Sequence, residues 1–543
     1  MSASNMPHQE EPPEDEGDVM LDPAEAGEEI PEDEDFPMGS DGEDEEEDPS
    51  ATLEEIQLQN DSVAHFDAHK DSIFCIAQHP IHPEIVATGA GDDTAYIFDA
   101  TPPETPVLPA SYQSAPSTQP QERDSLRAIY KCEGHTDSVN AITFTLPRGE
   151  YVLTAGLDGR LRAYKDASSS LNGQNWTFLS TVQEVEEINW LIPCPHPSYP
   201  NTIALGANDG SVWIYTVNAA DTASPLTIVQ AFYLHTESCT AGAWSPDGKL
   251  LATVSEDSSL YVWDVFSEAA AAGLTQTEGS SGGQTVVGLT AADQRFAVEG
   301  GLYSVAISPT GTFVVVGGAE GGIRVIGLPR IGALTSSSTG ARGSGAASKS
   351  AGGKRSGGPN NLSTSSSPSA GQAGTILAAL QSQSDGIETL SFSSPPLTLL
   401  AAGSVDGSIT LFDTAHRFAV RRHIKDAHEE FAVVKVDFVR PAGGAQAQAQ
   451  AQAPAAGAAT ASSSASGGWL LTSCGMDGVV RRWDTRGGTA AAGQGLVGEW
   501  RGHRGDGEGG GVLGFVQGGR GGRDIVTAGD DGVSLVFDAS STA

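Results

Sequence analysis

The sequence has few basic residues. It contains 29 Lys and Arg against 70 Asp and Glu, which gives a formal net charge of -41. The first fifty residues hold 21 of the acids and no Lys or Arg, so the remainder still has 49 acids against 29 bases. Because Lys and Arg supply most of the affinity for a phosphate backbone, this deficit disfavours direct DNA or RNA binding and favours basic partners.

The sequence also lacks long hydrophobic runs. No apolar stretch approaches the length of a membrane span, and the N-terminus has neither the basic region nor the apolar run of a secretory signal. We therefore expect a soluble intracellular protein, cytoplasmic and without a membrane partner. Lys349, Lys354 and Arg355 are too sparse to indicate a nuclear signal, so nuclear entry stays open.

Cysteine is scarce as well. The five cysteines form no C-x-x-C pair, which argues against a zinc site and against a disulfide framework. We expect free thiols buried in strands at Cys75, Cys132, Cys194, Cys239 and Cys474.

Several segments are too poor in apolar residues to form a core. Residues 1–54 are rich in Glu, Asp and Pro, which predicts a disordered acidic tail. The remaining residues, 55–543, contain four stretches of Pro-rich, Gly-rich, Ser-rich or Ala/Gln-repeat composition. We expect disordered insertions near 101–123, 269–283, 335–371 and 443–468.

What the sequence does contain is a repeat of short β-prone runs. An acidic residue stands six positions before an aromatic or apolar residue that ends a strand, and this register occurs eight times. The pairs are Asp92 with Phe98, Asp158 with Tyr164, Asp209 with Tyr215, Asp257 with Trp263, Glu320 with Ile326, Asp406 with Phe412, Asp477 with Trp483 and Asp531 with Phe537. The repeat predicts an all-β protein of eight blades with almost no helix.

Five repeats add an upstream histidine and a hydroxyl four residues before the acid. These pairs are His69 with Thr88, His135 with Thr154, His235 with Thr253, His428 with Ser473 and His503 with Thr527. The other three repeats lack both together and have Leu205, Val316 and Ala402 at the hydroxyl position. A cooperative buried network predicts this joint presence or absence, because a partly satisfied polar set is less stable than an apolar replacement.

Residues 62–538 thereby resemble the WD-repeat family, in which Asp, His, Ser or Thr and Trp form a hydrogen-bonded network within each blade of a single β-propeller. Phe98 and Phe537 depart from the family pattern because Phe offers no N–H, so their blades should have weaker networks. An open ring would expose two strand edges, so we expect residues near Ser62–Phe66 to complete the last blade.

A closer resemblance rests on the stretch from His65 to Phe74, on Ala87–Asp93 and on the acidic tail. Together they are similar to the subgroup that contains angio-associated migratory cell protein and a ribosome-assembly relative. That resemblance implies a dedicated chaperone for a newly made large-subunit ribosomal protein, L-ten, which is held on an acidic propeller face.

The recurring His, Ser or Thr and Asp residues could be mistaken for hydrolase triads. Because the set occurs five times at one spacing, we assign it to structure and expect no catalytic residue. Residues 505–511 are rich in Gly but follow no strand-to-helix pattern, so no phosphate loop is indicated. We therefore expect no cofactor, no nucleotide and no metal.

The WD-type fold implies that the loops bearing the histidines and the turns bearing the repeated acids share one face. Lys70 and Arg504 are among the few bases in matching positions. Carboxylates in these positions occur on nearly every blade: Asp71, Asp93, Asp137, Glu184, Glu186, Glu187, Glu237, Glu256, Glu299, Glu429, Glu430 and Asp530. So many on one rim favour a binding surface for a basic protein, with the propeller acting as a monomer.

Two other functions stay open. Residues 470–477 and 483–486 resemble the box by which some WD proteins dock on cullin-ligase adaptors, which would make the chain a recruiter of ubiquitination substrates. A signalling scaffold is the other alternative.

The acidic tail has two interpretations. It keeps the protein soluble, or it captures a basic client before transfer to the ring.

Overall fold

The structure is a computed structural model, and it describes residues 59–103, 124–168, 170–275, 284–331, 372–440, 467–487, 495–503, 510–518 and 523–540. The chain divides into two units, residues 1–57 and 58–543, and the second is described below. The predicted tail lies outside the described residues. So do the predicted insertions, apart from residues 101–103, 269–275 and 467–468.

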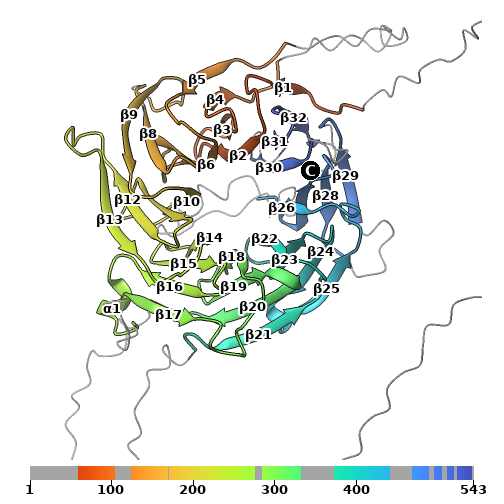
Figure 1. Cartoon of the computed structure of the whole chain (residues 1–543). Helices are drawn as coiled ribbons and strands as arrows, with labels where there is room; N and C mark the ends of the chain where they lie inside the picture. Colours follow the sequence, from red (N-terminus) through yellow and green to blue (C-terminus); the bar gives the residue numbers. More distant parts are fainter. Residues whose placement is uncertain are drawn as a thin grey trace, which may run out of the picture. The chain divides into compact units, whose positions relative to one another are not determined.

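The second unit is a ring of eight antiparallel four-stranded sheets, as the repeat predicts (Figure 1). The first strand of each sheet lies next to the axis and contacts the first strands of both neighbouring sheets. These strands are β2 (Ile73–Gln78), β6 (Val139–Phe144), β10 (Ile188–Pro193), β14 (Cys239–Trp244), β18 (Leu302–Ile307), β22 (Ile387–Phe392), β26 (Val433–Phe438) and β30 (Val512–Gln517). We number the blades 1 to 8 in this order.

The second strands are almost completely buried. Their sequences are runs of apolar and small residues, such as IVATGA in β3 and YVLTAG in β7, which is typical of strands covered on both faces. They are β3 (Ile85–Ala90), β7 (Tyr151–Gly156), β11 (Thr202–Ala207), β15 (Leu250–Ser255), β19 (Phe313–Gly318), β23 (Leu399–Ser404), β27 (Leu470–Gly475) and β31 (Asp524–Gly529).

The third strands carry the residues that the repeat places six positions after the acid, and all eight are buried, with at most 4% exposed. These strands are β4 (Ala95–Asp99), β8 (Arg160–Asp166), β12 (Val212–Val217), β16 (Leu260–Asp264), β20 (Gly322–Gly327), β24 (Ile409–Asp413), β28 (Val480–Asp484) and β32 (Ser534–Asp538). The outer strands of blades 1 to 7 are β5 (Ala128–Cys132), β9 (Trp176–Gln183), β13 (Leu226–Phe232), β17 (Thr285–Leu289), β21 (Ile376–Gln381), β25 (Ala419–Ile424) and β29 (Leu496–Trp500).

The hydrophobic core lies between neighbouring blades. One cluster joins Leu153 and Leu161 of blade 2 to Ile203 and Leu205 of blade 3, and others join the remaining blades in the same way. Each sheet is thus buried by the sheets on either side of it, as in other face-to-face sheet packings.

Helix is rare in the described residues. The α-helix α1 (Glu268–Ala271) and the 3-10 turns η2 (Ala319–Gly321), η3 (Thr414–His416) and η4 (Gly467–Trp469) are short, and no helix there is long and apolar enough to cross a membrane. Ala269 of α1 is fully buried in the core between blades 4 and 5, and Leu274 packs against it. Residues 269–275, which composition assigned to a disordered insertion, therefore include a core position, because an alanine in a Gly-rich segment can still fill core space.

The cysteines are all free, as expected. Four are buried and Cys75 is half-buried, and four of the five lie within strands.

The ring is closed by a strand from the other end of the unit. β1 (Ala64–Phe66) pairs antiparallel with β32, with Ala64 opposite Val536 and Phe66 opposite Ser534 (Figure 1). The Val63 amide extends this pairing by donating to the Val536 carbonyl at 2.7 Å. The expectation that residues near Ser62–Phe66 complete the last blade is confirmed.

Two truncations test how much closure contributes to stability. Deleting residues 1–54 should leave the melting temperature unchanged. Deleting residues 1–68 should lower it by several degrees, because the edge of β32 loses its partner and Phe66 leaves its stack on Phe98 (4.2 Å between ring centroids). Equal melting temperatures in differential scanning calorimetry would contradict this role for β1.

Candidate functional site

In blade 1, His69 links the loop before β2 to the second strand and to the turn that follows it. Its Nδ1 lies 3.3 Å from the Asp92 carboxylate and its Nε2 lies 3.0 Å from the Thr88 hydroxyl. A carboxylate can only accept, so Nδ1 donates and Nε2 accepts from the hydroxyl. Burial lowers the pKa of His69, although Asp92 opposes the shift, so the ring is neutral at neutral pH. The Lys70 amide also donates to Asp92, at 3.0 Å.

Blades 2, 7 and 8 repeat this arrangement. In blade 2, His135 lies 3.0 Å from Asp158 and 2.8 Å from Thr154. In blade 7, His428 lies 2.8 Å from both Asp477 and Ser473. In blade 8, His503 lies 3.1 Å from Asp531 and 2.7 Å from Thr527. The five hydroxyl residues, including Thr253 of blade 4, are completely buried. No substrate can reach them, so the set is structural in its geometry as well as its spacing.

Blade 4 differs from the predicted pairing. His235 Nδ1 bonds to the Ser259 hydroxyl at 2.6 Å and lies 3.9 Å from Asp257. Ser259 thus stands between the histidine and the acid, and its amide donates to Asp257 at 2.8 Å.

Tryptophan completes the chain of bonds in two blades. Trp263 Nε1 donates to Thr253 at 2.8 Å, and Trp483 Nε1 donates to Ser473 at 2.9 Å. Blade 2 resembles the Phe-containing blades more than expected, because the Tyr164 hydroxyl bonds to the Glu133 carbonyl instead of to its own blade's threonine.

Blade 6 lacks the histidine and the network hydroxyl but keeps part of the network. Gln383 stands in the histidine position and its amide donates to the Ala402 carbonyl and to Ser408. Asp406 accepts from Ser384 and Ser408, and these bonds lower its pKa to about 2 although burial opposes them. Half of the network therefore persists without the histidine.

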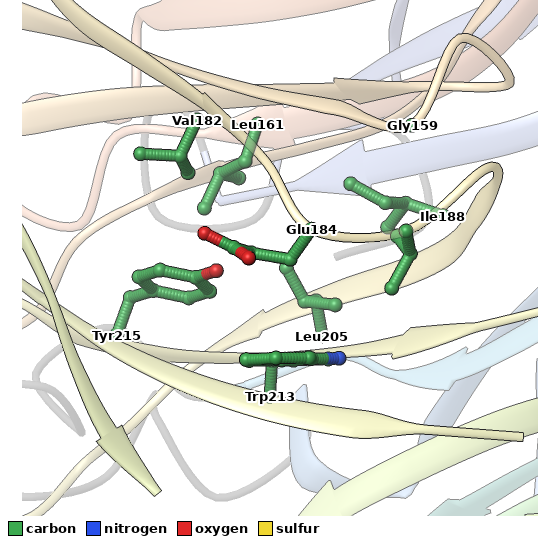
Figure 2. Close-up of a pocket in the computed structure, with 9 residues that line it drawn as sticks. Gly159, Leu161, Val182, Glu184, Ile188, Leu205, Trp213 and Tyr215 are labelled. Atoms are coloured by element: carbon green, nitrogen blue, oxygen red, sulfur yellow. The ribbon is translucent and has the colours of Figure 1, made fainter. Parts of the chain in front are cut away.

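Blade 3 shows what the missing histidine leaves behind. Glu184 occupies the histidine position, four residues before β10, and Leu205 occupies the hydroxyl position. A void of about 10 Å³ lies between them, lined also by Trp213 and Tyr215 (Figure 2). In blade 1 the corresponding space holds the imidazole, which packs edge-on against Tyr96, the counterpart of Trp213. The void has room for at most one water molecule.

Restoring the missing pair tests whether the network is cooperative. Leu205→Thr alone should destabilise the fold by about 1–3 kcal/mol, because it buries an unpartnered hydroxyl. Adding Glu184→His should recover much of this loss, because the ring fills the void and bonds to both the hydroxyl and Asp209. Urea unfolding of both single variants and the double variant gives the coupling energy, which we expect at about 1 kcal/mol or more. Additive effects would mean that the network is not cooperative in this blade.

One backbone hydrogen bond gathers the loops of each blade at one end of the ring. The turn between the second and third strands donates to a carbonyl of the loop that leads into the first strand, here called the lead-in loop. This bond occurs in all eight blades: Gly91 to Ser72, Leu157 to Ser138, Asn208 to Glu187, Glu256 to Ser238, Ala319 to Gly301, Val405 to Gly386, Met476 to Ala432 and Asp530 to Gly511. Turns and lead-in loops thus form a single face, here called the acidic face.

The structure places all twelve predicted carboxylates on this face. Asp93, Glu187 and Asp530 are half-buried. The others are exposed: Asp71, Asp137, Glu184, Glu186, Glu237, Glu256, Glu299, Glu429 and Glu430. Blades 8 and 1 are joined at this face by Ser72, whose hydroxyl donates to Asp530 at 2.6 Å. The carboxylates therefore belong to one continuous surface.

Little positive charge offsets these carboxylates. Among the residues that the structure describes, none of the twelve forms a salt bridge. Lys70 is exposed on the face, and Arg160, which the sequence reasoning did not count, bonds to the Gly134 carbonyl at 3.1 Å. Arg504 lies outside the described residues. The face therefore offers excess negative charge to a partner.

Sequence reasoning missed three acids of this face. Asp385 stands two residues before β22, as Asp71 does before β2, and this spacing could have found it. Asp426 lines an open hollow of about 360 Å³ with Glu429 and Glu430. Glu388 lies within a strand, where no loop pattern pointed to it.

Comparison with known proteins places the fold in a family. The model of the family "WD domain, G-beta repeat" matches residues 60–99, 126–165, 226–264 and 295–326. These ranges cover the first three strands of blades 1, 2, 4 and 5 to within a residue, and the first three ranges also contain the outer strand of the preceding blade. The crystal structure of Chaetomium thermophilum Sqt1 is 50% identical, with a TM-score of 0.69, and the match covers 89% of this chain and 99% of that chain. The chain belongs to the Sqt1 family of WD-repeat propellers.

Three further similarities extend the comparison. Sqt1 of C. thermophilum has also been solved bound to the N-terminus of the ribosomal protein L10; that chain is 49% identical, with a TM-score of 0.69, and 89% of this chain and 100% of that chain are covered. The ribosome assembly protein SQT1 of Saccharomyces cerevisiae is 31% identical over 229 residues, 41% of this chain and 46% of the yeast protein. Human angio-associated migratory cell protein is 23% identical over 444 residues, 82% of this chain and 74% of the human protein.

One carboxylate of this Sqt1-family propeller is held in a strained conformation. Asp93 has φ 58°, a left-handed backbone that disfavours side chains, and the corresponding turn residue is glycine in six of the other seven blades. Burial raises the pKa of Asp93, and the carboxylates of Asp137 and Asp92 raise it further. The position therefore combines a left-handed backbone with like charges nearby.

Asp93→Gly should separate stability from binding. The variant should be more stable by about 0.5–1 kcal/mol, because strain and repulsion are relieved, and it should bind a basic client more weakly. Ser258→Gly at the matching position of blade 4 is the control: it should lose stability, because the Ser258 hydroxyl donates to the buried Val298 carbonyl at 2.7 Å. Chemical denaturation and peptide titration measure the two effects. A less stable Asp93→Gly variant would show that the aspartate is there for structure.

Proposed function

We propose that this propeller is a ribosome-assembly chaperone that holds the N-terminal segment of the large-subunit ribosomal protein L10 on its acidic face. The observation that carries the proposal is the continuous set of exposed carboxylates without described basic partners. The L10-bound Sqt1 structure, 49% identical to this chain, supports the identity of the client. A Lys- and Arg-rich segment held there is shielded from RNA and from aggregation until assembly.

Binding rather than catalysis fits the site. The histidines that could act as bases bond to hydroxyls and acids inside the blades, and the completely buried hydroxyls cannot act as nucleophiles toward a substrate. The exposed acids are spread over many loops instead of converging on one reacting centre. We therefore propose a non-catalytic protein whose partner is another protein.

The adaptor function has less support. In blade 7 the residues of the docking box serve the blade itself, since Trp483 is buried and bonds to Ser473. Arg486 pairs with Asp484 of the same blade at 2.7 Å. Purification of the full chain from cells that are making ribosomes distinguishes the two functions: a ribosomal protein should accompany it, and a cullin adaptor in its place would favour ubiquitination.

Charge reversal on the face tests the mechanism directly. A variant in which four face carboxylates are changed to Lys should bind an L10 N-terminal peptide about a hundredfold more weakly or not at all, because attraction turns into repulsion. The four changes are Glu186→Lys, Glu187→Lys, Glu237→Lys and Glu256→Lys. Wild-type binding should weaken as salt rises, because the screening length shrinks to about 8 Å at physiological ionic strength. Fluorescence anisotropy with a labelled peptide measures both effects.

A matched control carries the same charge change at the opposite end of the blades, on the connections between first and second strands and between third and outer strands. Its changes are Glu84→Lys, Asp124→Lys, Glu150→Lys and Asp221→Lys. This variant should bind nearly as tightly as wild type. Both variants should stay folded, because none of the changed side chains is buried in the core, and thermal melting checks this. If the face variant bound the peptide as tightly as wild type at low salt, the acidic-face mechanism would be wrong.

A further inference from the structure

The first strands share an irregularity near their start, where they follow the lead-in loops at the acidic face. This inner edge of the acidic face is here called the mouth of the ring. Each of the eight first strands pairs with the second strand of its blade, but residue two of the first strand has no partner in this pairing. This unpaired residue is a β-bulge. A bulge turns the extra residue away from the sheet. In blade 5 that residue is Tyr303, whose exposed fraction is 36%.

Neighbouring blades fix the position of Tyr303. The carbonyl of Leu302 accepts from the Thr240 hydroxyl of blade 4 at 2.5 Å. On the other side, the Ser304 hydroxyl donates to the Ile387 carbonyl of blade 6 at 2.7 Å. Hydrogen bonds on both flanks thus fix the backbone of the tyrosine before any partner binds.

Carboxylates from two neighbouring blades lie near the Tyr303 ring. Glu388 is the bulged residue of β22, directly across the Ser304 bond. The Glu256 turn packs against the lead-in loop of blade 5, where a Cβ on Gly301 would lie 3.0 Å from the Glu256 Cα. Burial raises the pKa of the Tyr303 phenol, and Glu256, Glu388 and Glu237 raise it further.

An aromatic ring face and a carboxylate both attract cations, and they satisfy different parts of one guanidinium. The planar group of arginine stacks on the ring while its N–H groups pair with carboxylates, whereas the lysine ammonium is a strongly hydrated point charge. Among the described residues, no Lys or Arg lies over the Tyr303 ring, and Glu256 and Glu388 form no salt bridge.

We propose that Tyr303, with Glu256 and Glu388, forms a subsite that selects arginine over lysine in the bound segment. This inference rests on the proposed function, and it adds a specificity that net charge alone does not give. Tyr303 is a binding residue in this proposal, and the two glutamates orient the guanidinium on its ring.

The test uses two peptides of equal length and charge. Both are based on the L10 N-terminal segment; in one every basic residue is Arg, and in the other every basic residue is Lys. Wild type should bind the Arg peptide about three- to tenfold more tightly. Tyr303→Leu should lose this preference by weakening the Arg peptide alone, whereas Tyr303→Phe, which keeps the ring, should retain it.

Tyr199→Leu is the control for loss of an exposed tyrosine. Tyr199 has a similar exposed fraction, 38%, but lies between β10 and β11 at the opposite end of the blades, so its loss should leave the preference intact. An unchanged preference in Tyr303→Leu, or equal binding of both peptides by wild type, overturns the arginine subsite and leaves the proposed function standing. If wild type bound neither peptide, the proposed function itself would fail, and the subsite with it.

Discussion

The hydrogen bond between each turn and its lead-in loop is the constraint on which the acidic face depends. Gly91 and Ser72 make it in blade 1, and Val405 and Gly386 make it in blade 6, where the histidine is absent. The side-chain network therefore reinforces a contact that the backbone already makes. Because both loop types are tied together in every blade, any carboxylate on either loop reaches the same surface, whether its blade has the full network or not.

The same turns contain two kinds of acid with separate roles. Asp92 accepts bonds from His69 and the Lys70 amide, which lower its pKa although burial opposes the shift. Its neighbour Asp93 makes no such bonds and has a raised pKa. Glu256 stands beside Asp257 in the same way. One acid of each pair stabilises the blade and the other stays available, so the binding charge can change without unfolding the ring.

Most of the fold could be predicted from the sequence because the repeat follows from strong physical requirements. A buried second strand needs an uninterrupted apolar run, and the acid that closes the following turn needs a fixed distance to the third strand. Those two patterns are enough to count the blades. The closing strand near Phe66 was predictable too, because a ring cannot leave an edge open.

The site was less predictable where geometry rather than composition decides it. Asp385 was missed although it follows the same spacing as Asp71, two residues before the first strand of its blade, so that spacing is the signal that could have found it. Glu388 and Tyr303 depend on β-bulges, which shift the register by one residue and leave no compositional mark. The position of Ser259 between His235 and Asp257 likewise depends on differences of about an ångström, which no residue spacing encodes.

The two parts of the proposed site act over different distances. Dispersed carboxylates attract any basic chain from afar and speed its encounter, but proteins that bind RNA are basic as a class, so charge alone cannot choose among them. Selection requires short-range contacts that differ between cations of equal charge. A tyrosine held at the mouth of the ring, with Glu256 and Glu388 beside it, supplies such a contact where the attraction of the surrounding carboxylates is concentrated. Attraction and discrimination thus occur at the same place and share two carboxylates, and only discrimination depends on the Tyr303 ring.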